Sequence, residues 1–287
     1  LGAISISIPA VNIVDGVIAT SELIGNTLSS ATPATGHDSF QRIIKEAQQA
    51  NIMFLIQQAN LRSSELNSED IKKLNEQIAE VDAAPNKKIS SIEVSAYASP
   101  DGGVNLNTKL AEQRESNTAD YVNRQLRKAK VDAALEAKYT AQDWEGFQEL
   151  VSKSNIQDKE LILRVLSMYK DPQQREQEIK NISSVYKTLA DVILPQLRRS
   201  RLTLNYEIIG KSDDEISNLA TNNPAQLNIE ELLYAATLTS NATRQEAIYT
   251  QATKQFPNDY RAYNNLGKLA YEAGDLAKAE SFVNKAA

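Results

Sequence analysis

The strongest constraint on the fold is a strand that passes through one short turn directly into a long helix. Apolar residues alternate with polar ones in the strand, as they do where one face of a sheet is buried. The turn reads Ser-Pro-Asp-Gly-Gly over residues 99–103, and a helix is predicted from about Asn107 to Lys130. The alternating apolar positions of the strand are Ile92, Val94, Ala96 and Ala98.

A second strand and helix are predicted before this pair. The continuous apolar run Ile52–Ile56 suits a strand that is buried on both faces. Ser68 then opens an amphipathic helix whose apolar positions lie three and four residues apart. Strand, helix, strand, helix is the start of a βαβ layout, so the chain is predicted to hold an α+β domain. Those helical positions are Ile71, Leu74, Ile78 and Val81.

A further helix is predicted just upstream of the first strand. Asp38 or Ser39 can cap it, and its apolar positions follow a helical period. Residues 1–36 before it read as strand and then linker, either the end of an earlier domain or an edge addition to the next one. The apolar face of the predicted helix is Phe40, Ile43, Ile44 and Ala47.

The later part of the sheet domain is interrupted by a helical insertion. A strand is predicted near residues 134–140 and a last one at Leu202–Ile208, with about 143–195 between them almost all helix. Trp144 and Phe147 share one face of this insertion and are expected in its core. The basic run 198–201 is interpreted either as an anion patch or as a cap on the preceding helix, whose C-terminal end favours positive charge.

The composition restricts the chemistry. The 287 residues are 41% hydrophobic and 24% charged with a net charge of −6, and no basic block has the size of a nucleic-acid footprint. There is no cysteine and a single histidine, His37. Thiolate sites and sites that need two imidazoles are excluded, so we expect no enzyme, metal or cofactor. No apolar run has the length of a membrane span.

Residues after about 228 repeat with a period of about 34 and resemble tetratricopeptide repeats. Gly267 and Ala279 stand where paired helices approach closely, and Tyr249 and Leu266 where side chains fill the gaps between them. An ordinary helical pair could mimic this period. Two units are fewer than a free-standing array needs, so the helices either lean on the preceding domain or continue past Ala287. The resemblance implies a surface that binds a protein partner.

Arg114 is the most telling side chain of the predicted helix. At ~100° per residue, Leu110, Arg114 and Tyr121 fall within roughly 40° of each other, so the guanidinium lies on the inward side. A charge there needs a negative partner. That partner is either an internal carboxylate or a ligand carboxylate held by both arms of the guanidinium. The wheel position alone favours the internal ion pair.

The same residues resemble the OmpA-like, peptidoglycan-associated family. Its members have a strand, an Asp-x-x-Gly turn, and then Asn, Leu and Arg in the register of Asn107, Leu110 and Arg114. Phe54–Leu61 resembles the first strand and turn of that family, and Arg201 resembles the arginine before its last strand. The resemblance covers roughly 51–209 outside the insertion. Domains are therefore expected at 1–36, 37–210 and 211–287, the last one all-α and tetratricopeptide-like.

The resemblance implies non-covalent binding of the diaminopimelate-type peptide of peptidoglycan. Arg114 and Arg201 would take its carboxylate, and Asn107 would orient the loop. Two positions depart from the family pattern, because Ser99 replaces the turn aspartate and Leu55 falls near an acidic or polar position. Both departures remove charge that would hold the ligand amine, although Asp101 could replace it. The expected ligand residues are Ser99, Asp101, Asn107, Leu110, Arg114 and Arg201.

The family also implies a location in the periplasm of a Gram-negative envelope, next to the outer membrane. The insertion and the fused repeats resemble versions of the domain from the Bacteroides group. We expect the outer-membrane association to come from a part outside this chain. The alternative function is an assembly scaffold of the outer membrane in which the OmpA-like fold no longer binds peptidoglycan and the repeats bind the partner.

Overall fold

The computed structural model describes residues 32–156, 158–181 and 183–287. The expected strand and linker at residues 1–36 therefore lie mostly outside the described residues. The described residues form two compact units: Gln41–Lys211 is one, and Ser212–Ala287 together with residues 32–40 is the other. Each unit is described by itself below.

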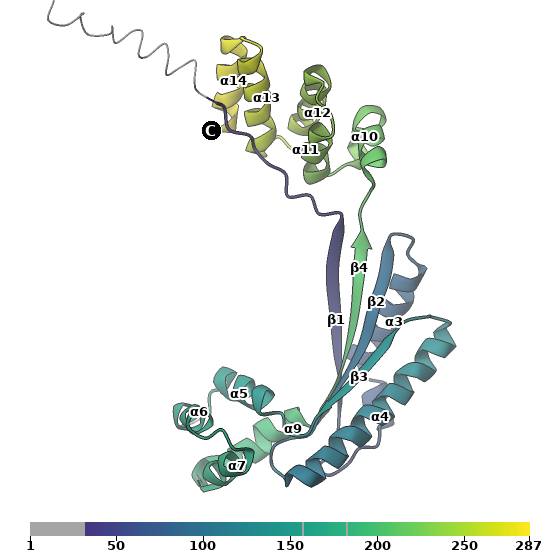
Figure 1. The fold of residues 1–287 in the computed structure, drawn as a ribbon, viewed down its shortest axis with the longest axis vertical. Coiled ribbons are helices and arrows are strands. Elements are labelled where there is room, and N and C mark those ends of the chain that lie inside the picture. The colour runs from purple at the N-terminus through teal and green to yellow at the C-terminus, as the bar shows by residue number, and fades with distance from the viewer. Residues whose placement is uncertain (1–31, 157, 182) are drawn as a thin grey trace, which may run out of the picture. The chain divides into compact units, whose positions relative to one another are not determined.

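The first unit is built on a mixed four-stranded sheet in the order β1-β4-β2-β3 (Figure 1). β4 pairs antiparallel with both β1 and β2, while β3 pairs parallel with β2. The unit therefore belongs to the α+β class, and its last strand lies between the first two. The strands are β1 (Ile43–Met53), β2 (Lys87–Tyr97), β3 (Leu135–Thr140) and β4 (Arg199–Ile209).

Two helices cover one face of this sheet, α3 (Glu69–Ala83) and α4 (Val104–Ala129), and the one-turn helix α2 (Ser63–Leu66) precedes them. The predicted apolar positions of α3 are all buried against the strands. Alternate residues of β2 and β4 meet them from below, which is the period that a sheet with one covered face requires. The core contains Ala50, Ile52, Ile71, Leu74, Ile78, Val81, Ile92, Val94, Tyr121, Val122, Leu126, Leu202 and Leu204.

The helix predicted from Asp38 is wrong, because the chain enters β1 at Ile43. Eleven residues of β1 pair with β4, and this ladder outweighs the helical spacing of the local sequence. The strand predicted at 52–56, buried on both faces, is also corrected. β1 lies at the edge of the sheet and ends at Met53, and Leu55 and Ile56 beyond it are 46% and 58% exposed.

The helical insertion is confirmed. It has its own apolar core, to which Phe147 contributes a fully buried ring and Trp144 a partly buried one, as expected. Asp143 caps its first helix by accepting a hydrogen bond from the Gly146 amide at 2.9 Å. The insertion consists of α5 (Trp144–Lys153), α6 (Lys159–Met168), α7 (Pro172–Asn181), α8 (Ser183–Thr188), the π-helical turn η1 (Leu189–Ile193) and α9 (Leu194–Leu197).

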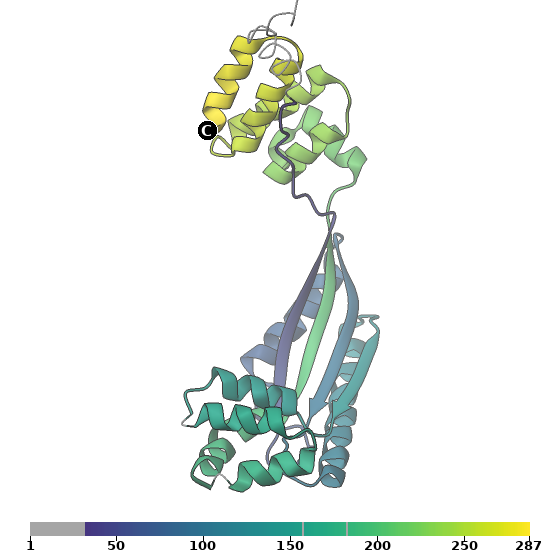
Figure 2. The same ribbon diagram turned by 60° about the vertical axis from the view of Figure 1, so that its left-hand side comes forward.

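The second unit is all-helical, and Figure 2 shows its helices from a second side. Gly267 packs so closely that an added Cβ would lie 3.0 Å from a methyl group of Val283, which explains the small residue predicted there. Gly274 takes a positive φ of 80° and ends the helix before it. The helices are α10 (Asp213–Asn222), the 3₁₀ turn η2 (Pro224–Gln226), α11 (Ile229–Thr237), α12 (Ala242–Gln255), α13 (Tyr260–Glu272) and α14 (Leu276–Ala286).

Candidate functional site

The turn between β2 and α4 is held by the side chain of Asn107. Its Nδ2 group donates hydrogen bonds of 2.9 Å to the main-chain carbonyls of both Ser99 and Gly102. Gly102 lies so close that an added Cβ would meet Asn107 Oδ1 at 3.0 Å. Asn107 is buried at 4% exposure, so these bonds are shielded from water. The asparagine and the glycine together give the turn a fixed shape.

Arg114 lies two turns further along α4 and is 1% exposed. Its Nε donates to the Gln58 carbonyl at 2.9 Å, its Nη1 to the Tyr97 carbonyl at 2.8 Å, and its Nη2 makes a longer contact of 3.4 Å to the Leu55 carbonyl. The guanidinium thus joins the loop after β1 to the end of β2. It also lies 4.9 Å from the centre of the Phe54 ring.

The internal carboxylate that the helical position favours as a partner of Arg114 is not found among the residues that the structure describes. The N–H groups of Arg114 donate to main-chain carbonyls instead. Carbonyl dipoles offset only part of the cost of burying a full charge. Burial lowers the pKa of Arg114 to about 10, and the nearby charge of Arg198 adds to the shift while Asp101 opposes it. The pocket arginine is therefore charged at neutral pH but incompletely compensated.

Asp101 meets a different arginine. Arg198 donates from Nη2 to Asp101 Oδ2 at 3.0 Å and from Nε to Ser99 Oγ at 3.3 Å, and the Ser99 hydroxyl in turn contacts Asp101 Oδ1. The ion pair is largely buried, with the two side chains 12% and 15% exposed. Asp101 is therefore already paired with Arg198. This pairing limits how well Asp101 can replace the missing turn aspartate as a partner for a ligand amine.

These groups line one small pocket at the end of β2, with a volume of about 50 Å³. Its charged residues are Arg114, Arg198 and Asp101, which sum to a net charge of +1. A pocket for a whole drug-sized ligand is roughly 300–1,000 Å³, so this one has room for a single group such as a carboxylate. The remaining lining residues are Ile56, Gln57, Ala98, Ser99, Gly102, Leu106, Asn107 and Leu110.

The pocket contains five of the six residues expected from the sequence, and Arg201 is the exception. Arg201 lies inside β4, paired in register with Asn51 and Ser95. Its neighbour Leu202 points into the core under α4, so strand alternation puts Arg201 on the opposite face of the sheet. Its guanidinium is 5.9 Å from the centre of the Tyr97 ring.

Arg198 lies in the pocket at the position expected for Arg201. The predicted position of Arg201 is wrong because β4 begins at Arg199, three residues before the expected Leu202. The basic run 198–201 holds the sequence signal for this residue. Arg198 is the one arginine of the run that lies outside β4, so its side chain can turn toward the β2–α4 loop. Arg199 caps α9 by donating from Nη1 to the Gln196 carbonyl at 3.0 Å, which confirms the capping interpretation for that member of the run.

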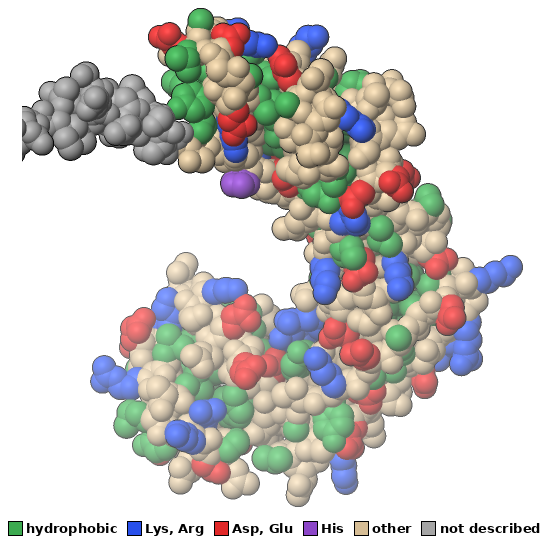
Figure 3. Space-filling model, turned by 45° about the horizontal axis from the view of Figure 1, so that its top comes forward, with side chains coloured by type: hydrophobic (Ala, Val, Ile, Leu, Met, Phe, Trp, Pro, Cys, Tyr) green, Lys and Arg blue, Asp and Glu red, His purple; other side chains and the backbone are tan. Residues whose placement is uncertain are grey.

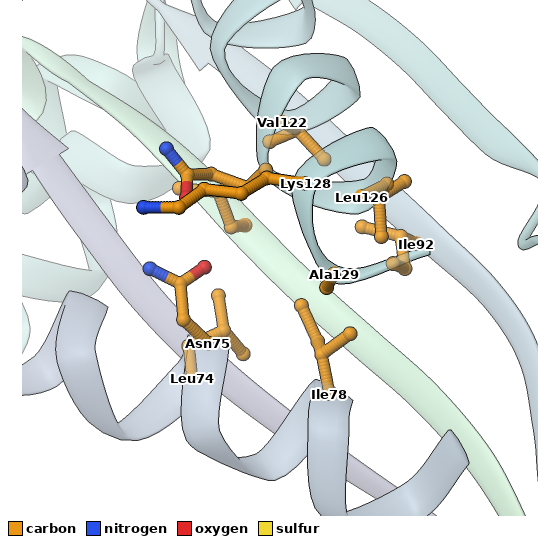
Figure 4. Close-up of a pocket in the computed structure, with 10 residues that line it drawn as sticks. Leu74, Asn75, Ile78, Ile92, Val122, Leu126, Lys128 and Ala129 are labelled. Atoms are coloured by element: carbon orange, nitrogen blue, oxygen red, sulfur yellow. The ribbon is translucent and has the colours of Figure 1, made fainter. Parts of the chain in front are cut away.

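A second pocket of about 270 Å³ lies between α3 and α4 (Figure 4). Its walls are apolar, with Leu74, Ile78, Val122 and Leu126 among them, and the polar groups of Asn75 and Lys128 lie along one side. Lys128 is the only ionisable residue of the lining. This pocket is an apolar gap between helices and gathers no set of groups for chemistry.

The described residues hold no set of three or more His, Cys, Asp or Glu side chains placed to bind a metal. Acidic and basic side chains are interspersed over the face shown in Figure 3. None of the helices that the structure describes is long and apolar enough to cross a membrane.

In the helical unit, residues 34–40 run along the C-terminal helices as a segment without helix or strand (Figure 2). Asn265, 2% exposed, accepts from the Gly36 amide at 2.7 Å and donates to the Gly36 carbonyl at 2.9 Å. Asn264 donates to the Ala34 carbonyl at 2.9 Å, and Arg261 to the His37 carbonyl at 3.3 Å. The α13 helix thus binds the main chain of a segment more than 200 residues away in the sequence.

Arg261 is compensated by two carboxylates. It donates to Glu230 at 2.7 and 3.0 Å and to Asp259 at 2.7 Å. These hydrogen bonds raise the pKa of Arg261 and lower the pKa of both carboxyl groups. Glu230 also accepts from the Ser39 amide at 2.6 Å. The ion pair is therefore part of the same surface that holds the segment.

Comparison with known proteins identifies one part of the chain. Residues 248–281 match the family model of the tetratricopeptide repeat, which covers the end of α12, all of α13 and the start of α14. No curated protein matches the chain. No solved structure matches it. The structure and this match together define an α+β sheet unit followed by C-terminal helices that contain a tetratricopeptide repeat. The repeat indicates a helical surface for protein interaction.

Proposed function

We propose that this chain is a non-catalytic cell-envelope protein that binds a peptide carboxylate of peptidoglycan in the sheet unit and a protein partner on its helices. The proposal includes the OmpA-like assignment of the sheet unit and a place in the periplasm next to the outer membrane. One observation carries it. Arg114 and Arg198 lie in one carboxylate-sized pocket with Asp101 as its only acid, so the pocket has an unmatched positive charge.

An anion in that pocket would relieve two costs at once. It would offset the incomplete compensation of Arg114, and it would reduce the repulsion between the two guanidinium groups. Guanidinium groups suit carboxylates because their parallel N–H groups match the two oxygens. The Ser99 hydroxyl and the fixed turn around Gly102 also line the pocket.

The ligand amine has weaker support. Asp101 already pairs with Arg198, and neither Ser99 nor Leu55 supplies a negative charge. We therefore propose that the carboxylate carries the recognition of the diaminopimelate-type side chain. A carboxylate contact with one paired acid nearby predicts modest affinity that weakens as salt screens it.

A second function is favoured by a different observation. Three N–H groups of Arg114 already contact main-chain carbonyls, as is expected of an arginine with a structural role. In this alternative the sheet unit is a scaffold of the outer membrane that has lost its ligand, and the helical repeat alone binds the partner.

Co-sedimentation with purified peptidoglycan sacculi at low salt separates the two functions. The first function predicts that the wild-type chain is depleted from the supernatant and that Arg198→Gln reduces the depletion about tenfold. Arg201→Gln is the matched control, because this arginine lies three residues away on the other face of the sheet and should bind as wild type does. Failure of the wild-type chain to co-sediment contradicts peptidoglycan binding and favours the scaffold.

A further inference from the structure

The segment 34–40 is held mainly through its main chain, as a bound peptide would be. Both main-chain polar groups of Gly36 pair with one buried asparagine, Asn265. The Ser39 amide pairs with Glu230, and the carbonyl of His37 with Arg261. Such contacts recognise an extended chain and carry little sequence information by themselves.

Three positions of the segment supply the sequence information. A Cβ on residue 36 would lie 2.9 Å from Arg261 Cβ and 3.0 Å from its Cα, so this position requires glycine. The Thr35 hydroxyl accepts from Lys268 Nζ at 2.7 Å. The Phe40 ring stacks on Tyr234 with 4.5 Å between ring centres.

Two of the three positions between the glycine and the aromatic residue are exposed, and the third, Asp38, is half-buried and accepts a hydrogen bond from the Phe40 amide at 3.1 Å within the segment. His37 and Ser39 are exposed, and both contact the helices through main-chain atoms. The selected pattern is therefore a hydroxyl residue, glycine, three further residues and an aromatic residue.

A second feature of the surface that binds the segment lies next to Thr35. A pocket of about 260 Å³ adjoins it, lined in part by Tyr249, Lys268 and Glu272. A peptide that extends into this pocket would find further contacts there.

From these contacts we propose that α11 and α13 form a peptide-binding groove and that residues 35–40 are an internal copy of its ligand. The partner is a protein segment with the pattern Thr or Ser, Gly, three residues, then Phe or Tyr. It must displace the internal copy, which shares the chain with the groove and so competes at high local concentration. This inference rests on the protein-interaction role proposed for the helices, and it names the partner class.

The test uses the full chain and a fluorescent peptide of residues 32–41. Gly36→Ala in the chain should release the internal segment and leave the groove intact. Gly103→Ala is the matched control, since a Cβ there meets nothing within 4 Å. By fluorescence anisotropy, the peptide should bind the Gly36→Ala chain at least tenfold more tightly than it binds the wild-type and Gly103→Ala chains.

Two further readouts complete the test. The peptide carrying Gly36→Ala should fail to bind the opened chain, and the one carrying Phe40→Ala should lose about tenfold in affinity. Hydrogen exchange should show the amides of Gly36 and Ser39 protected in the wild type and unprotected in the Gly36→Ala chain.

Equal affinity of the peptide for all three chains would overturn the proposal, and so would no binding to any of them. Persistent protection in the Gly36→Ala chain would overturn the glycine requirement and with it the internal-ligand assignment. A wild-type dimer whose amides lose protection on dilution would show that the segment comes from a second copy, which also contradicts the proposal. Sacculus co-sedimentation depends on the other unit, so failure here leaves that result unchanged.

Discussion

Each unit has an arginine, an asparagine and a glycine around a main-chain segment. The charge of the arginine is compensated by carboxylates in one unit and not in the other. In the sheet unit, Arg114, Asn107 and Gly102 surround the turn after β2. In the helical unit, Arg261 and Asn265 surround Gly36. In both, an asparagine amide binds main-chain atoms and a glycine permits the close approach. The arginines differ, because Arg261 donates hydrogen bonds to two carboxylates while Arg114 donates hydrogen bonds to carbonyl oxygens.

The charge of one arginine is therefore compensated by the protein itself, and the charge of the other is not fully compensated. The arginine of the groove is neutralised within the protein, and the groove already holds a peptide segment. The arginine of the pocket is buried without a carboxylate of its own, which lowers its pKa where the other pKa is raised. On this account, the first site is occupied from within the chain, and the second has charge left for a ligand.

The largest expected effect comes from removing the pocket arginine. Arg114→Ala leaves a cavity and takes the donors from the carbonyls of Gln58 and Tyr97, so it should lower the free energy of unfolding of the sheet unit by about 4 kcal/mol. Trp144 lies in that unit and reports its unfolding by urea through fluorescence. Arg124→Ala, an exposed position on the same helix, should change it by less than about 0.5 kcal/mol. Equal stabilities would contradict the structural role of Arg114.

The two asparagines should respond differently to the same change. Asn107 uses only its donor group, so Asn107→Asp puts a carboxylate beside two carbonyls and should cost about 3 kcal/mol. Asn265→Asp keeps the acceptor for the Gly36 amide and should cost about 1–2 kcal/mol. Urea denaturation measures both, with the exposed Asn105→Asp as a control for the first. A larger loss for Asn265→Asp would reverse the comparison.

A smaller effect is expected from the groove arginine, with a distinctive pH dependence. Arg261→Gln should cost about 1 kcal/mol, since its ion pairs are partly exposed. The folded pKa values of Glu230 and Asp259 lie below their ordinary values of 4.5 and 3.8. The stability they contribute is present above those values and is lost as pH falls through the lower folded pKa values.

Thermal unfolding of the helical unit measured between pH 6 and roughly pH 3 should therefore show a steeper loss for the wild-type chain than for Arg261→Gln. The same slope in both chains would mean that this ion pair does not determine the acid sensitivity.

The sequence patterns correctly predicted the covered face of the sheet and most of the pocket residues. They placed the starts of β1 and β4 wrongly. The apolar periods of α3, β2 and β4 were recognised because each follows from burial on one face. The start of β1 was missed because Ile43 and Ile44 are exposed at 51% and 42%, and such a strand is specified by its pairing with β4. Its own sequence has no strand period there to read.

The site residues show the same limit. Asn107, Leu110 and Arg114 follow from a fixed spacing on one helix, so they could be placed together from the sequence. The second arginine of the pocket comes from just before β4, so its prediction depends on where β4 begins. An error of three residues there put Arg201 in the place of Arg198. The carbonyl partners of Arg114 could not be predicted, because main-chain atoms have no sequence signal.

The central claim is that the pocket of the sheet unit has charge left for a carboxylate. The most direct test is the thermal unfolding of that unit, followed by Trp144 fluorescence, with a soluble peptidoglycan peptide containing diaminopimelate. At a hundredfold excess over its Kd, the peptide should raise the unfolding temperature by about 5 °C, and the same peptide with that carboxylate amidated should not. No shift with the free acid, or an equal shift with the amide, would contradict the account.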